Sequence, residues 1–258
     1  MSGVVLSEKR ARVHWITINR PERKNALNRE TILALRDHLA ESGKETDTRV
    51  VVLTGAGGSF CSGADLQAGQ SESAPANEDL LEDGFNATIR ALWNLPKPVI
   101  AAVDGVAAGF GCSLALATDV RLASPSARFS LLFVKRGLTL DGGASYFLPW
   151  LAGLRGMEMA LTGDMISVED ALRMGLVNRV VAEAEFQAHV ATYAESLSKN
   201  APLALAAIKA SIHKALASNL DDTLTAEMNE QRRMTKTEDV REGVAAFLEK
   251  REPIYKGK

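Results

Sequence analysis

Residues 99–117, VIAAVDGVAAGFGCSLALA, pass from an apolar strand through a glycine turn into a helix. Every position from Val99 to Val103 is apolar, which is typical of a strand that is buried on both faces of a parallel sheet. Gly105 allows the chain to turn, and a helix is expected to begin near Gly109. This succession of strand, turn and helix predicts an α/β fold.

The same unit occurs earlier in the chain. Strand patterns cover residues 13–18 and 49–54, and the breaker Pro96-Lys97-Pro98 separates a helical pattern at 80–92 from the next strand. Asn28 is a candidate N-cap for the helix that lies between the first two strands. Strands and helices therefore alternate along the chain and do not form separate blocks.

The C-terminal part has a different pattern. Ser167 opens a sequence typical of a capping box, and a strand is expected at 176–181. From about Glu183 onward only amphipathic helices are predicted. One of them carries an apolar stripe formed by Val240, Val244, Phe247 and Leu248. We therefore divide the chain into an α/β core at 1–195 and a helical region at 196–258, with a surface loop at 67–79.

Composition excludes several classes of protein. The 258 residues carry a formal net charge of -2, so the chain has no overall field that would attract nucleic acid. No apolar run is long enough for a signal peptide or a membrane span. The two cysteines, Cys61 and Cys112, have no metal-ligand spacing and are expected to be packing residues. These features predict a cytoplasmic protein without a metal site.

Two glycine-containing turns are the candidate chemical sites. Gly109-Phe110-Gly111 precedes a helix, so backbone N–H groups near Phe110 should lie unpaired at its start, where they favour negative charge. Gly63-Ala64 follows an apolar strand in the same way, and glycine lets a substrate approach the backbone closely. Either turn alone is more often an ordinary connection, whereas the pair is more specific.

The sequence resembles the enoyl-CoA hydratase/isomerase (crotonase) family along nearly its whole length. The resemblance is carried by Asn19-Arg20-Pro21, Asn25-Ala26-Leu27, FCSGADL at 60–66, PVIAAVDG at 98–105, LTGD at 161–164, GLV at 175–177 and AFLEKR at 246–251. It implies a crotonase-like spiral of repeated ββα units and a C-terminal helical trimerisation region. It also implies homotrimers, often paired into hexamers, and an acyl-CoA thioester as the ligand, with no cofactor beyond this coenzyme A.

The resemblance assigns roles to single positions. The backbone N–H groups of Ala64 and Phe110 would form an oxyanion hole for the thioester carbonyl. The residues implied to border coenzyme A are Arg23, Lys24, Ala26, Leu27, Ala64, Asp65, Leu66 and Lys250, the last of these from the same chain or from an adjacent subunit. Arg23, Lys24 and Lys250 could equally be solvated surface cations. Asp65 is expected to be a structural acceptor and not a base.

The chain departs from the family where hydratases carry two glutamates. Ser113 and Phe133 align with those positions, and neither side chain is a general base near neutral pH. A positioned acid or base contributes ~10² to 10⁴ in rate, so we predict against efficient hydration of a 2-enoyl-CoA. Leu138 and Trp150 are expected to line the acyl pocket together with these two residues.

Asp141 is the remaining carboxylate in this region. Some relatives carry an aspartate there that acts on the acyl chain, and apolar surroundings would raise its pKa. A single base beside an oxyanion hole is sufficient to move a double bond. Alternatively, Asp141 is only the N-cap of a helix that begins at Gly142.

Three functions are therefore open. We favour an isomerase that acts through an enolate, with Ala64 and Phe110 as donors and Asp141 as proton shuttle. The second is a non-catalytic acyl-CoA-binding protein that kept the pocket, and the third is an enoyl-CoA hydratase. Ser113 lacks the glycine pattern of a nucleophile elbow, and the four histidines are scattered, which argues against a hydrolase or a metal site.

Overall fold

The computed structural model describes residues 3–67 and 80–258, so all but the first residue of the loop predicted at 67–79 lies outside the described part. A six-stranded sheet has the order β1-β2-β3-β4-β6-β9. Its first two strands are antiparallel and the others parallel. The strands are β1 (Val5–Arg10), β2 (Val13–Ile18), β3 (Val50–Gly55), β4 (Val99–Val103), β6 (Val120–Ala123) and β9 (Arg179–Val180).

The strands predicted at 13–18 and 99–103 are confirmed, and the one predicted at 49–54 is found one residue later, from Val50 to Gly55. The strand predicted at 176–181 is wrong in its extent, because the ladder with β6 includes only Arg179 and Val180, with the N–H groups of Asn178 and Val181 bonded to β6 carbonyls on either side. The carbonyl of Leu176 instead accepts a hydrogen bond from Arg121 Nε at 2.7 Å. The Asn178 side chain accepts from the Arg121 N–H at 2.8 Å. Side chains thus satisfy groups that a longer ladder would need.

A second, three-stranded sheet is formed by β5 (Val106–Ala108), β7 (Arg128–Ser130) and β8 (Ile166–Ser167). β4 belongs to the large sheet, β5 to the small one, and α4 (Phe110–Leu116) follows directly. β6 and β7 repeat this division between the two sheets. This arrangement is the spiral of strand–strand–helix turns that the family resemblance implies.

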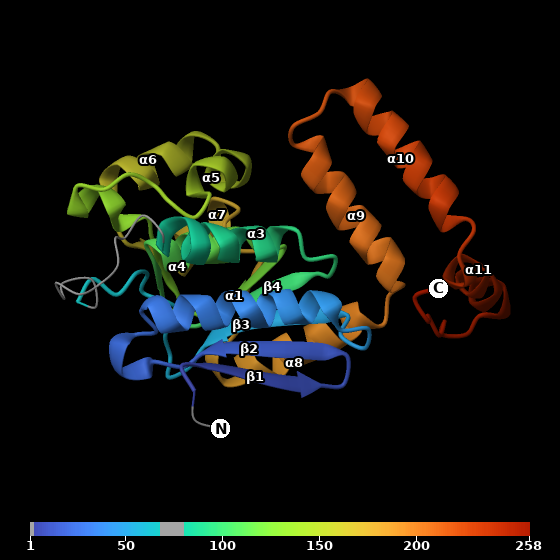
Figure 1. The fold of residues 1–258 in the computed structure, drawn as a ribbon, viewed down its shortest axis with the longest axis horizontal. Coiled ribbons are helices and arrows are strands. Elements are labelled where there is room, and N and C mark those ends of the chain that lie inside the picture. Colours follow the sequence, from blue (N-terminus) through green and yellow to red (C-terminus); the bar gives the residue numbers. More distant parts are fainter. Residues whose placement is uncertain (1–2, 68–79) are drawn as a thin grey trace.

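Helices cover both faces of the large sheet (Figure 1). On one face lie α1 (Arg29–Lys44), a π-helical segment at Leu81–Asn86 and α3 (Ala87–Trp93), which packs against α1. α8 (Phe186–Ser198) covers the opposite face. The helices α5 (Ala144–Ala152), α6 (Leu154–Thr162) and α7 (Val168–Arg173) follow β7. Burial on both faces explains why β3 and β4 are apolar at nearly every position.

The C-terminal helices are α9 (Pro202–Ala215), α10 (Leu220–Met234) and α11 (Glu238–Glu249), and among the described residues no strand follows β9. Lys209 on α9 pairs with Asp119 at 2.8 Å and so ties this helix to the core. α10 and α11 stand apart from the sheet (Figure 1). The predicted stripe on α11 is solvent-exposed, Phe247 by 82%. The core helix α8 runs past the predicted boundary at 195.

Several local predictions are also confirmed. The Asn28 side chain accepts a hydrogen bond from the Thr31 N–H at 2.9 Å, and Ser167 caps α7 in the same way. Cys61 and Cys112 are free and buried, and burial raises the pKa of each thiol to about 12, so both stay protonated as packing residues. Within residues 3–67 and 80–258, no helix has the length and apolar character needed to cross a membrane.

Candidate functional site

The two glycine-containing turns lie side by side. The Cys61 N–H donates to the Val106 carbonyl at 2.9 Å, and the Ala108 N–H donates back to the Cys61 carbonyl at 2.9 Å. A methyl group placed on Gly63 would lie 2.9 Å from the Ala108 oxygen and 3.4 Å from the Phe110 nitrogen. The backbone at 63–64 therefore passes directly beside the start of α4.

Glycine is required at two positions of this contact. Gly109, the N-cap of α4, has φ 52° and ψ -129°, a conformation that residues with a Cβ rarely adopt. A methyl group on Gly111 would lie 2.1 Å from the Cys61 carbonyl oxygen. These two glycines let the segment that follows β3 approach the first turn of α4 at backbone distance.

Two backbone donors remain available there. In the part of the chain that the structure describes, the N–H groups of Ala64 and Phe110 donate to no acceptor. Phe110 is the first residue of α4, where an N–H has no intrahelical partner. Its ring is buried against Phe85, with a centroid distance of 4.6 Å. The pair can accept one negatively charged or polarised oxygen without a side-chain donor.

Most residues predicted to border coenzyme A gather beside Ala64. The Ser62 N–H donates to the Lys24 carbonyl at 3.0 Å, and Arg23 donates to the side chain of Gln67. Arg23, Lys24 and Leu66 are exposed, whereas Ala26 and Leu27 are buried. Exposed cations and buried apolar residues thus lie together in the segment beside Ala64.

Asp65 is a structural acceptor, as predicted. Its Oδ2 pairs with Arg20 Nη2 at 2.9 Å, and its Oδ1 accepts from the Gln67 N–H at 3.2 Å. Neither Arg20 nor Asn25, which anchors the same loop, was singled out for a role from the sequence. The sequence feature that could have indicated a role for Asn25 is the turn after Pro21, because asparagine tolerates the left-handed conformation that Asn25 adopts with φ 57°.

Asp141 precedes a glycine that packs on the side chains of Phe110 and Ser113, and it is not a helix cap. α5 begins at Ala144 with Gly143 as its N-cap and has no side-chain capping bond, so the capping interpretation is wrong. Asp141 Oδ1 is buried and has no hydrogen-bond partner among the described residues. Burial raises the pKa of this carboxyl from 3.8 to about 6. A methyl group on the neighbouring Gly142 would touch the Phe110 ring at 2.9 Å and Ser113 Cβ at 2.8 Å.

The predicted pocket residues are only partly brought together. Ser113 is buried in α4, where its hydroxyl donates to the Gly109 carbonyl at 3.4 Å. Phe133 is also buried, in the 3₁₀ segment Leu132–Arg136, but Leu138 is 56% exposed. Ser113 and Asp141 thus flank the same first turns of α4. Leu138 presents its side chain to solvent in the single chain.

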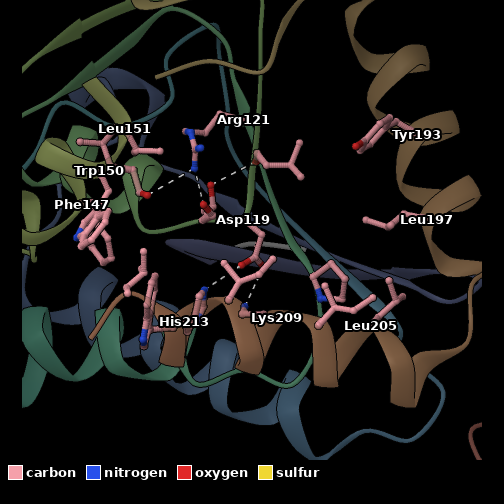
Figure 2. Close-up of a pocket in the computed structure, with 18 residues that line it drawn as sticks. Asp119, Arg121, Phe147, Trp150, Leu151, Tyr193, Leu197, Leu205, Lys209 and His213 are labelled. Carbon is pink, nitrogen blue, oxygen red and sulfur yellow. Dashed lines mark hydrogen bonds and ion pairs between the residues drawn. The ribbon is translucent and has the colours of Figure 1, made fainter. Parts of the chain in front are cut away.

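Trp150 lines a different cavity, of about 470 Å³, between the core and the helices α8 and α9 (Figure 2). None of the other predicted site residues lines this cavity. Lys209 Nζ already donates to Asp119 at 2.8 Å and to the Leu92 and Lys97 carbonyls. Arg121 is likewise bound to backbone carbonyls. Lys209 thus holds α9 on the core through Asp119 and two backbone carbonyls, and backbone carbonyls hold the Arg121 side chain.

Lys250 is not near Ala64 in the single chain. It follows α11, which lies far from α4 in Figure 1, and its backbone adopts the left-handed conformation with φ 54°. The predicted contact between Lys250 and coenzyme A stays a prediction.

The spiral fold and the two neighbouring unpaired backbone donors agree with the family that the sequence resembles. The chain belongs to the enoyl-CoA hydratase/isomerase family, because the family model with that description matches residues 8–258. It is 40% identical to a probable enoyl-CoA hydratase of Rhodobacter capsulatus, with 94% of each chain covered. It is 38% identical to 1,2-epoxyphenylacetyl-CoA isomerase of Escherichia coli, with 100% of each covered.

The solved structures agree with this family. An enoyl-CoA hydratase from Bacillus anthracis superposes with a TM-score of 0.94 at 34% identity, covering 99% of this chain and 100% of the other. The predicted crotonase fold is thereby confirmed. The names of the relatives include both hydratases and an isomerase, so they do not choose between these two reactions.

Proposed function

We propose that this protein is an enoyl-CoA isomerase that moves a carbon–carbon double bond through an enolate. The observation that carries the proposal is the position of Asp141, a half-buried carboxyl beside the turn that packs on Phe110, with a buried oxygen that bonds to none of the described residues. A pKa raised to about 6 leaves this group ionised at neutral pH and still able to hold a proton transiently.

The proposed reaction needs only this carboxylate and the two backbone donors. The thioester oxygen accepts hydrogen bonds from the N–H groups of Ala64 and Phe110. The Asp141 carboxylate removes a proton from C2 of a 3-enoyl-CoA, and the electron pair of that C–H bond delocalises onto the thioester oxygen as a dienolate. The C3–C4 double bond shifts to C2–C3 when Asp141 returns the proton to C4. No cofactor beyond the coenzyme A of the substrate is required.

We extend the proposal to the binding of coenzyme A and to the assembly of subunits. Arg23 and Lys24 are exposed at the rim, where their charge suits the phosphates of coenzyme A. We infer that Lys250 joins them from a neighbouring subunit of a trimer, or of a hexamer built from two trimers. The exposed apolar stripe that includes Val244, Phe247 and Leu248 supports such an assembly. A cytoplasmic location agrees with two free thiols in Cys61 and Cys112.

Hydration is the second candidate, because relatives carry that name. It would need a group that activates water, and the aligned positions hold Ser113, whose hydroxyl donates to the Gly109 carbonyl, and Phe133. Asp141 would have to act alone in that reaction. We therefore expect hydration of crotonyl-CoA to be slower than isomerisation by ~10² or more.

The test is proton NMR of a 3-enoyl-CoA incubated with the protein in deuterated water. We expect the 2-enoyl isomer to form with deuterium in the acyl chain, and we expect Asp141→Ala to lose this activity while it still binds the thioester. Asp164→Asn is the matched control, since this exposed carboxylate pairs only with Lys135 among the described residues. Crotonyl-CoA is assayed in parallel for hydration.

Each result selects one function. Isomerisation that survives in Asp141→Ala would remove the proposed base. Rapid hydration without isomerisation would favour the hydratase, and tight binding without either reaction, over a range of linear and aryl thioesters, would favour the non-catalytic binding protein.

A further inference from the structure

The peptide unit that carries the Ala64 N–H is held from its opposite side. The Leu27 N–H donates to the Gly63 carbonyl at 2.8 Å, and the Asp65 N–H donates to the Leu27 carbonyl at 3.0 Å. In a trans peptide the carbonyl and the N–H point in opposite directions. Leu27 therefore fixes the direction of the Ala64 N–H by holding the carbonyl of the same peptide unit.

Arg20 connects the two chain segments that form this contact. Its Nη1 donates to the Ala26 carbonyl at 2.5 Å, and its Nη2 pairs with Asp65 Oδ2 at 2.9 Å. Ala26 immediately precedes Leu27, and Asp65 immediately follows Ala64. Both charged side chains are largely buried, so the pair is shielded from salt and water. The Arg20 guanidinium therefore bonds to both segments: the one at Ala26 and Leu27, which holds the peptide unit, and the one at Ala64 and Asp65, which contains this peptide unit.

The backbone of Arg20 is also held in place. The Arg20 N–H donates to Asn25 Oδ1 at 2.8 Å, and Asn25 Nδ2 donates to the carbonyls of Ala56 and Ser59 at 2.8 and 2.5 Å. Asn25 is fully buried. The guanidinium therefore starts from a backbone that cannot shift without breaking this set of bonds.

We propose that Arg20 is a positioning residue that sets the direction of the Ala64 N–H, acting through Ala26 and Asp65. This inference rests on the proposed oxyanion role of Ala64 and not on the identity of the reaction. Arg20 does not touch the thioester. A displacement of about 1 Å in a reacting geometry can cost ~10²-fold in rate, so loss of this residue should affect turnover more than binding.

The experiment uses the full-length protein and cinnamoyl-CoA, a conjugated thioester whose absorption moves to longer wavelength when its carbonyl is polarised. We expect Arg20→Gln to bind this probe within about threefold of the unchanged protein and to lose most of the red shift. For a substrate that turns over, kcat should fall ~10- to 10²-fold with little change in KM.

Two further variants separate positioning from folding. Arg20→Lys keeps the charge opposite Asp65 but cannot form both bonds from one planar group, so an intermediate red shift is expected. Ser167→Ala removes the N-cap of α7 far from this loop and controls for a general loss of stability. It should leave the red shift unchanged.

The outcomes distinguish this inference from the proposed reaction. A red shift that is present in the unchanged protein and lost in the Arg20 variants supports the inference even when no isomer forms. A full red shift in both Arg20 variants, or no red shift in the unchanged protein with the probe bound, overturns it.

Discussion

Replacing Asp141 with asparagine should make the protein more stable and much less active. The carboxyl has a buried oxygen without a partner in the described part of the chain, and its pKa is raised by burial from 3.8 to about 6. Between these two values the unfolded chain has released the proton and the folded chain still holds it. The free energy of unfolding therefore falls as the pH rises through this window, and the destabilisation is complete above about pH 6.

The magnitude follows from the same shift. At about 1.4 kcal/mol per pKa unit, a rise from 3.8 to about 6 gives an upper limit of about 3 kcal/mol. Because the carboxyl keeps part of its surface in water, we expect roughly half of this, about 1.5 kcal/mol. An asparagine side chain carries no charge and would escape this cost, while isomerisation would slow by ~10² to 10⁴.

Urea denaturation of both proteins at about pH 4 and about pH 8 measures the effect, since the difference should be present only at the higher pH. The NMR assay in deuterated water measures the activity of the same samples. A variant that is less stable than the unchanged protein at the higher pH would show that Asp141 has a favourable partner in solution, and the argument for a raised pKa would fail.

Three other perturbations test separate parts of the structure. The pH profile of kcat/KM should rise to a plateau with an apparent pKa near 6, because the ionised Asp141 is the base, and a flat profile from about pH 5 to 8 would contradict this. Gly111→Ala should either fail to fold or lower the free energy of unfolding by more than about 4 kcal/mol, because its methyl group would overlap the Cys61 carbonyl. Gly58→Ala is the control with open space around the added methyl group, and it should lower the free energy of unfolding by only about 1 kcal/mol. Lys209→Met should lower the free energy of unfolding in urea by about 3 kcal/mol, because the largely buried Asp119 carboxylate would keep only His213 and the Val99 N–H as partners among the described residues, and a loss below about 1 kcal/mol would show that the Lys209–Asp119 pair is not important for stability.

The large sheet could be predicted because its strands are long and apolar. Residues 50–54 and 99–103 carry an apolar run that only a doubly covered strand explains. The small sheet was not predicted, since β5, β7 and β8 have three residues or fewer and show no periodicity. Its strands are defined by contacts with distant segments, such as the pairing of Cys61 with Ala107.

The candidate site was predicted where backbone chemistry determines it. The turns at Gly63-Ala64 and Gly109-Phe110 could be recognised as a pair, and the structure places them in contact. The interpretation of Asp141 as a cap failed because Gly142 and Gly143 both adopt positive φ and delay the helix to Ala144. The sequence could not show this, since a glycine permits such a turn without requiring it.

Other assignments depended on directions that a sequence does not contain. Trp150 lies on a helix with one face toward the cavity beside α9, and its helical position alone did not say which cavity it would meet. Arg20 was part of a recognisable motif, yet its function as a link between two loops requires the fold. A residue that joins segments more than forty positions apart leaves no local pattern.

The proposed oxyanion donors belong to the main chain, and this separates two properties that most binding sites combine in one residue. At Phe110 the N–H would polarise the substrate while the ring packs against Phe85. Substitution of this buried ring by another apolar group of similar volume would repack the core around α4 and leave the donor in place. Side chains around the proposed donors can therefore change, in nature or in the laboratory, without a new pair of donors having to be built each time.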